Sequence, residues 1–355
     1  MILLLDNAHD SAQVRPLLPG STGCLVIVTS RNRFAGLIAH EAAHPVLVGR
    51  LDRAAGWDLL ARRLGDRRLT ADPAATGALL RLCAGLPLAL SITAARAAVR
   101  PNLSLADVVA EMEAAAHRLD GLRTGEPQDD VRSAFSWSYA ALSPSASRLF
   151  RLLAVHPAAE IPAAAAASIA GTTASGEALA ELHSANMITE LGAGRYAVHD
   201  LLHAYAAELL DGDPGERDEA EHRLIDHYLY ATRAAYLTYR LPPPTDPGPP
   251  PAGVIPVTMP DDQAALDWYV TERPAIVGAI DLALDRGRAE AAAVIVLHVR
   301  PLRSSSAEAR ADSREQTSRV LAAVEQTGDS MLTIAILREA ATLVRGPEPG
   351  TRSSC

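Results

Sequence analysis

Two short apolar runs near the start of the chain each lead to a side chain that could bind a metal or a phosphate. Residues 2–5 are followed by Asp6, and residues 25–28 are followed closely by Arg31. Such runs, bounded by polar residues, predict parallel strands buried on both faces. An aspartate at the end of one strand can hold a hydrated Mg²⁺, and an arginine on the next can pair with a γ-phosphate. Either residue alone also fits a structural strand end or a solvated surface arginine.

A second candidate is the sequence HDLLH, which begins at His199 and ends at His203. Two histidines at this spacing on one helix can bind Zn²⁺ as in HExxH metalloproteases, with Glu221 or His222 as a candidate third ligand. Asp200 replaces the general-base glutamate of that motif and is one methylene shorter. His199 is also expected at a strand-to-helix junction, so zinc chemistry is the disfavoured interpretation.

The elements that position these residues are expected to be mostly α-helical. A short crossover helix through residues 11–18 would join the two strands, and helical spacing of apolar residues runs from about 51 to 99. Residues 131–210 predict three helices, a small hairpin around 192–194 and a further helix. Ser143 followed by proline is a good N-cap and first-turn pair for one of these helices. This order is typical of a winged helix.

The winged helix is not expected to read DNA. The helix that would enter the groove, about residues 175–185, carries Glu177 and Glu181 and no arginine. DNA phosphates would repel such a helix. We therefore expect these residues to form a lid within the protein.

The second half of the chain predicts helices on both sides of a linker. A long amphipathic helix is expected over 219–239, and residues 241–251 hold seven prolines in eleven positions. That composition predicts an extended linker. Beyond it, 262–286 and 290–302 predict a helical hairpin like the start of an α-solenoid, with no countable repeat period.

Composition limits the functional classes. A net charge of −9 argues against broad electrostatic capture of nucleic acid or anionic membrane. No apolar run is long enough to span a bilayer. Cys24, Cys83 and Cys355 form no CxxC pair, and the first two lie in apolar runs, which predicts buried, reduced thiols and a cytoplasmic protein.

Four segments occur in the order and at roughly the spacing of the NB-ARC domain of STAND NTPases: LLLDNA at 3–8, IVTSR at 27–31, GLPLAL at 85–90 and VHD at 198–200. GLPLAL is the most specific of them. The chain most resembles the antibiotic-regulatory, SARP-type transcription factors of actinomycetes. The resemblance covers residues 1 to about 210 well, and the proline-rich linker and 268–274 more loosely.

This resemblance implies a role for each candidate residue. Asp6 would be the Walker B residue that binds Mg²⁺, and Arg31 would be the sensor on the second strand. Pro87 would pack near the adenine and place the helical domain over it, a position suited to a rigid residue with no N–H. His199 would reach the β-phosphate of ADP and hold a closed, inactive state.

Two departures from the family pattern bear on activity. Asn7 stands where many relatives have a second acid, and an amide cannot act as a carboxylate base. The sequence contains no lysine, so it cannot contain a Gly-rich loop with a P-loop lysine. The expected protein is a truncated form that starts at the Walker B strand. It is at most a slow ATPase, with ADP or ATP and Mg²⁺ bound firmly only in a full-length form.

The resemblance and the pattern together divide the chain into seven segments: 1–48, the C-terminal part of a nucleotide-binding α/β domain; 49–125, a helical (ARC1-like) domain; 126–212, a winged helix; 213–240, a helix; 241–260, the linker; 261–345, TPR-like helices; and 346–355, an unstructured tail.

Three functional hypotheses follow. The first is a nucleotide-dependent signalling switch that controls transcription through an attached effector. The second is an interaction scaffold in which the NTPase remnant is inert, and the third is an ATPase that works with a P-loop from another polypeptide. The expected partners are proteins that bind the C-terminal helices, with self-oligomerisation, no direct DNA binding and no membrane.

Overall fold

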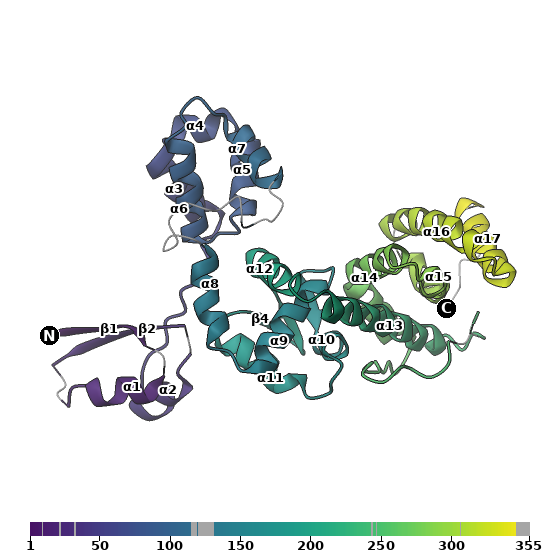
Figure 1. Cartoon of the computed structure of the whole chain (residues 1–355), viewed down its shortest axis with the longest axis horizontal. Coiled ribbons are helices and arrows are strands. Elements are labelled where there is room, and N and C mark those ends of the chain that lie inside the picture. Colours follow the sequence, from purple (N-terminus) through teal and green to yellow (C-terminus); the bar gives the residue numbers. More distant parts are fainter. Residues whose placement is uncertain are drawn as a thin grey trace, which may run out of the picture. The chain divides into compact units, whose positions relative to one another are not determined.

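The computed structural model describes residues 1–8, 10–20, 23–31, 33–114, 119, 131–242, 244–245, 247–305 and 307–345. The expected boundary at 125/126 and the expected tail at 346–355 lie outside these ranges. The described chain is mostly helical with small sheets, as the sequence predicts (Figure 1). Contacts divide it into two units. The first comprises Met1–Ala154 and Glu177–Gly212, and the second comprises Val155–Gly176 and the residues from Asp213 onward.

The first unit begins with a pair of parallel strands. β1 (Ile2–Ala8) pairs with β2 (Leu25–Ser30), with Leu5 opposite Val28. The crossover between them contains α1 (Ser11–Val14) and the 3₁₀ turn η1 (Arg15–Leu17). One face of the pair packs on a small core that includes Val14 and Leu37.

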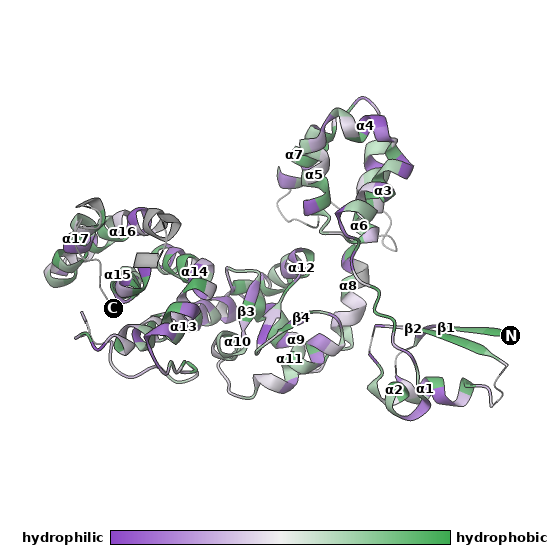
Figure 2. Ribbon diagram, turned by 180° about the vertical axis from the view of Figure 1, so that it is seen from behind, coloured by the Kyte–Doolittle hydropathy of each residue, from purple (hydrophilic) through white to green (hydrophobic). Residues whose placement is uncertain are grey.

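Burial on both faces, expected from the sequence, is wrong for these strands. Ile2 and Leu4 of β1 are 71% and 60% exposed, and Leu25 and Ile27 of β2 are 57% and 45% exposed. The side chains alternate in burial because α1 and α2 (Ala35–Glu41) cover only one face of the two-stranded sheet. Figure 2 shows how apolar both strands are. The apolar runs therefore predict the two strands correctly, but they do not show whether other elements pack on both faces of the sheet.

Residues 51–114 fold as helices, which confirms the helical spacing of 51–99. The helices are α3 (Arg53–Leu64), α4 (Asp66–Ala71), α5 (Pro73–Leu82), α6 (Pro87–Ala98) and α7 (Leu105–Ala114). Asp52 and Asp72 cap α3 and α5 by accepting backbone N–H groups. Cys83 is buried as expected, and burial raises the pKa of its thiol to about 11. Cys24 is only half-buried, because the strands beside it have one open face.

The remainder of the first unit contains the predicted hairpin and helices. α8 (Val131–Ala140), α9 (Pro144–Leu152) and α11 (Ser175–Ser184) precede β4 (Thr189–Gly192) and β5 (Arg195–Ala197), and α12 (Asp200–Leu210) follows. β4 and β5 pair antiparallel around Ala193 and Gly194, both with positive φ. Ser143 caps α9 as predicted. The two units divide residues 126–212 between them, so the winged-helix boundaries stay a prediction.

The second unit is built around long helices. Its elements are β3 (Glu160–Pro162), α10 (Ala163–Ala170), α13 (Pro214–Thr238), α14 (Asp262–Asp285), α15 (Ala289–His298), η5 (Arg300–Ser305), α16 (Ala307–Thr327) and α17 (Ser330–Arg345). Every residue of α15 except Glu290 is buried, and the helix contacts α13, α14, α16 and α17. The predicted hairpin of α14 and α15 is confirmed, and no described residue of 241–260 is helical.

Candidate functional site

Asp6 and Arg31 lie at the carboxyl ends of two neighbouring parallel strands, as the sequence predicts. The hydroxyl of Thr29 on β2 donates a short hydrogen bond to the carboxylate of Asp6. The same Oγ1 accepts the backbone N–H of Asn7 at 2.9 Å, and Asn7 has a φ of 55°. Thr29 therefore ties the end of β1 to β2 and directs the exposed carboxylate of Asp6 along the sheet edge.

The carboxylate of Asp6 could hold a cation only with help from other ligands. Nowhere in the described ranges do three His, Cys, Asp or Glu side chains gather into a metal site. Mg²⁺ is commonly held by one or two carboxylates together with waters and substrate phosphates. The single carboxylate, oriented by Thr29, would fit a Mg²⁺ whose other ligands are waters and a phosphate.

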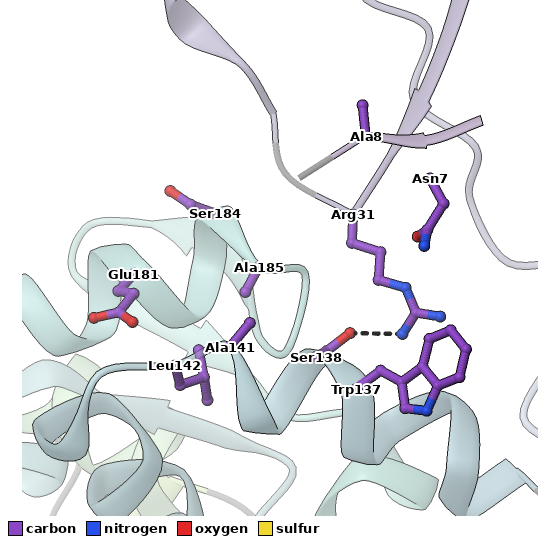
Figure 3. Close-up of a pocket in the computed structure, with 10 residues that line it drawn as sticks. All are labelled: Asn7, Ala8, Arg31, Trp137, Ser138, Ala141, Leu142, Glu181, Ser184 and Ala185. Atoms are coloured by element: carbon purple, nitrogen blue, oxygen red, sulfur yellow. Dashed lines mark hydrogen bonds between the residues drawn. The ribbon is translucent and has the colours of Figure 1, made fainter. Parts of the chain in front are cut away.

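Arg31 extends from the end of β2 across a cavity of about 450 Å³. Its Nη1 donates to Ser138 Oγ at 3.0 Å, and its Cζ lies 5.7 Å from the centroid of the Trp137 ring. The second distance is within the range of a cation–π interaction. Figure 3 shows the guanidinium between the strand ends and α8, beside the indole.

The backbone of Arg31 is held by a different element. Asn186, just after α11, donates its side-chain amide to the carbonyl of Arg31 at 2.7 Å. Asn186 has a φ of 56°, a left-handed conformation that asparagine adopts more readily than most residues. Glu181 also lines the cavity, but its two carboxylate oxygens accept the N–H and hydroxyl of Ser143, both at 2.6 Å.

His199 lies at the strand-to-helix junction, as predicted, and uses both ring nitrogens there. Nδ1 accepts the N–H of Leu201 at 3.1 Å and caps α12, while Nε2 pairs with the carbonyl of Ala84 at 3.0 Å. A carbonyl only accepts, so Nε2 carries the proton and the neutral Nε2–H tautomer satisfies both contacts. Neither nitrogen is left for zinc, which agrees with the disfavoured status of the HDLLH motif.

Pro87 begins α6, directly after the loop that His199 contacts. The loop turns through Ala84 and Gly85, at φ values of 52° and 71°. The carbonyl of Gly85 accepts the N–H of Leu51 at 2.9 Å, and a Cβ at Gly85 would collide with the Leu51 carbonyl. The glycine of the GLPLAL motif is therefore required by backbone packing, and the proline has the fixed φ suited to a first helical turn.

The structure thus gathers the four candidate residues into two pairs of neighbours. Asp6 and Arg31 share the sheet edge, and His199 adjoins the loop before Pro87. α8 and α12 connect the pairs. Arg132 on α8 forms a bidentate ion pair with Glu208 on α12, with both hydrogen bonds at 2.8 Å.

Aromatic contacts strengthen the packing of α8 against α12. Phe135 and Tyr139 of α8 lie 5.7 and 6.2 Å, between ring centroids, from Tyr205 of α12. Sequence reasoning missed Trp137, Ser138 and Asn186 as site residues. The adjacent Trp137 and Ser138 are the available signal in the sequence, but their partner Arg31 is 107 residues from Ser138.

Comparison with known proteins gives two curated relatives. The chain is 32% identical to Regulatory protein AfsR of Streptomyces griseus over 320 residues, which are 86% of this chain and 32% of the relative. It is 31% identical to Regulatory protein AfsR of Streptomyces coelicolor over 329 residues, or 90% of this chain and 32% of the relative. The chain therefore spans about a third of the length of these relatives. No family model matches it. Within the described ranges, every helix is too short or too polar to be a candidate membrane span.

Proposed function

We propose that this chain is part of a STAND-type switch that regulates transcription in the cytoplasm in response to bound ADP or ATP. The observation that carries the proposal is the pairing of Asp6 and Arg31 at one sheet edge, with Arg31 bonded directly to α8. The residue that we propose senses phosphate is thereby joined to a helix that could transmit the signal. Two similar proteins named as regulatory support the regulatory half of the proposal.

Each candidate residue has a distinct part in the switch. Asp6 holds Mg²⁺ beside the phosphates, and Arg31 binds the γ-phosphate through charge-assisted hydrogen bonds. Pro87 packs near the adenine. In the closed state, His199 exchanges its bond to the Ala84 carbonyl for a hydrogen bond from Nε2–H to the β-phosphate of ADP. Asn7 offers no carboxylate base, so hydrolysis is slow.

The first test is direct binding of Mg-ATP and ADP to this chain by titration calorimetry. The sequence has no lysine, and the site offers one carboxylate and one guanidinium. We therefore expect dissociation constants of about 1 mM or weaker. A low-micromolar constant would contradict the role given to these two residues, because it would require a complete phosphate cradle elsewhere in the chain.

The second test places this chain in the matching segment of the Streptomyces coelicolor relative and measures transcription of a reporter that the relative controls. Asp6→Ala should depress activation, because the metal ligand is lost. His199→Ala should raise basal output by roughly one to two decades, because a charge-assisted hydrogen bond contributes about 1.5–3 kcal/mol. Asp58→Ala is the matched control, since it removes an exposed aspartate of α3.

The alternative function is a scaffold that works without nucleotide. The observation in its favour is the exposed apolar side chains on the last described helix, Met331, Ile334 and Leu337 of α17. A scaffold would bind partner proteins, or another copy of itself, through these helices. In the same chimera, output unchanged by Asp6→Ala and Arg31→Ala but lost on Met331→Asp would favour the scaffold over the switch.

A further inference from the structure

Two arginines of the helices in 51–114 converge on one point of α5. Arg81 follows Gly77 by one helical turn on α5, and Arg53 is the first residue of α3. A Cβ at Gly77 would lie 3.7 Å from Nη1 of Arg81 and 3.7 Å from Nη2 of Arg53. The two nitrogens are therefore at most twice 3.7 Å apart. Two positive charges thus meet over a residue that has no side chain.

No carboxylate neutralises this pair of guanidinium groups. Among the described residues, neither group forms a salt bridge or donates a hydrogen bond, and both side chains are exposed. The acid next to Arg53 in sequence is Asp52, which caps α3 by accepting the N–H of Ala55 at 2.8 Å. Two other arginines of these helices differ in this respect, because Arg96 and Arg100 both pair with Glu111.

The pair is suited to an oxyanion that both guanidinium groups can reach. Each group presents planar N–H donors that match the oxygens of a phosphate or a carboxylate in pairs. An anion between two cations replaces their repulsion by two attractions. A phosphoryl group offers more charged oxygens than a carboxylate, so it can bond to both arginines at once. Arg50, three residues before Arg53, adds to the local positive charge.

We propose that Arg53 and Arg81 form an oxyanion site that binds a phosphoryl group. The inference does not depend on the proposed function, because neither residue is one of the four candidate residues above. The site adjoins the loop at Ala84 and Gly85, since Arg81 lies just before the loop and Gly85 accepts the N–H of Leu51. Two exposed guanidinium groups should give a dissociation constant of about 1 mM.

Protection of individual arginines from phenylglyoxal tests the site in the full chain. Inorganic phosphate is the probe, at about 10 mM with ionic strength matched by sodium chloride, or about tenfold above the expected constant. Modification of Arg53 and Arg81 should slow about tenfold, by mass action at one site. Arg62, exposed at the other end of α3, is the internal control and should react at an unchanged rate. Mass spectrometry after a digestion that does not cut at arginine reads each position.

Variants of the chain test whether the two arginines share one ligand. Arg53→Gln should remove the protection of Arg81, because one guanidinium group alone binds phosphate much less tightly. Arg62→Gln is the matched control and should leave the protection intact. Gly77→Glu places a carboxylate one turn before Arg81, where the two side chains can pair along the helix. It should slow the modification of Arg81 without phosphate, and phosphate should add little. Thermal melting of each variant confirms that it is folded.

The outcomes separate this site from the proposed function. Equal slowing at Arg62 would show general screening by the anion and would overturn the site, as would full protection of Arg81 in Arg53→Gln. Protection of Arg31 without protection of Arg53 and Arg81 would overturn the site and leave the proposed function standing. ADP in place of phosphate identifies the source of the phosphoryl group: protection at lower concentration assigns it to a nucleotide, and equal protection assigns recognition to the phosphoryl group alone.

Discussion

Removing the imidazole of His199 should lower the free energy of unfolding of the first unit. The loss can be divided between the hydrogen bonds of the two ring nitrogens. Nδ1 caps α12 through Leu201, and Nε2 donates to the carbonyl of Ala84, which precedes the GLPLAL loop. The first bond is local to the helix and the second joins positions 115 residues apart in sequence. Side chains that imitate one nitrogen at a time can therefore separate a helix cap from a tertiary contact.

The expected cost of His199→Ala is about 2 kcal/mol. Loss of an N-cap costs about 1 kcal/mol, and loss of one neutral hydrogen bond to a partly buried carbonyl costs about 1 kcal/mol. His199→Asn keeps an acceptor where Nδ1 lies but is too short to reach Ala84, so it should cost about 1 kcal/mol. His199→Gln reaches Ala84 with its amide but caps poorly, so its cost should also be about 1 kcal/mol.

Urea unfolding of the four proteins, followed by far-UV circular dichroism, measures these costs as shifts of the midpoint at constant slope. His222→Gln, an exposed histidine on α13, is the control and should shift nothing. The reasoning fails if Asn matches the wild type, because the bond to Ala84 would then contribute nothing. It fails equally if His199→Gln is as stable as the wild type, because the helix cap would then contribute nothing to stability.

Three further predictions concern other parts of the chain. Arg303→Met should cost about 3–5 kcal/mol, because it leaves the carboxylate of Glu339, 3% exposed, without its partner at 2.9 Å. Adding Glu339→Leu should recover most of that loss in urea unfolding. Burial lowers the pKa of His227 to about 3. Between about pH 6.5 and 3, the unfolded chain binds a proton at His227 that the folded chain does not. The free energy of unfolding therefore falls on acidification through that pH range. Between pH 7 and 5, the free energy of unfolding of His227→Gln should fall by roughly 2 kcal/mol less than that of His222→Gln. Chemical denaturation at each pH measures this difference. Residues 126–212 should give no salt-resistant, sequence-selective gel shift, because acidic side chains occupy the candidate recognition helix.

Local features of the fold could be predicted from the sequence because neighbours in the chain decide them. Ser143-Pro144 predicts the start of α9, since a serine hydroxyl caps the N–H of Ala146 and a proline suits the first turn. The Gly-Ala-Gly sequence at 192–194 predicts the hairpin between β4 and β5, because its residues adopt positive φ. His199 was likewise placed correctly at the start of a helix.

Features that depend on distant partners could not be predicted. The apolar runs 2–5 and 25–28 predict the two paired strands. They do not predict the exposure of Ile2 and Leu25, because burial depends on which elements cover each face of the sheet. The place of Arg31 just after a strand makes it a candidate site residue. Its partners Ser138 and Asn186, 107 and 155 residues away, carry no local pattern that points to it.

The Asp6–Arg31 pair and the His199–Pro87 pair are joined by one continuous set of contacts. The strength of these contacts sets the binding free energy that a ligand needs to break them. Arg31 holds α8, α8 is bonded to α12 through Arg132 and Glu208, and α12 begins at His199, which holds the loop before Pro87. A ligand shifts such an equilibrium only by the difference in its affinity for the two states. The two hydrogen bonds of His199 together contribute about 2 kcal/mol, so a ligand preference of one to two decades is enough to release that end. A site that binds phosphate weakly can therefore still control the helices, provided that the contacts it opposes are equally weak.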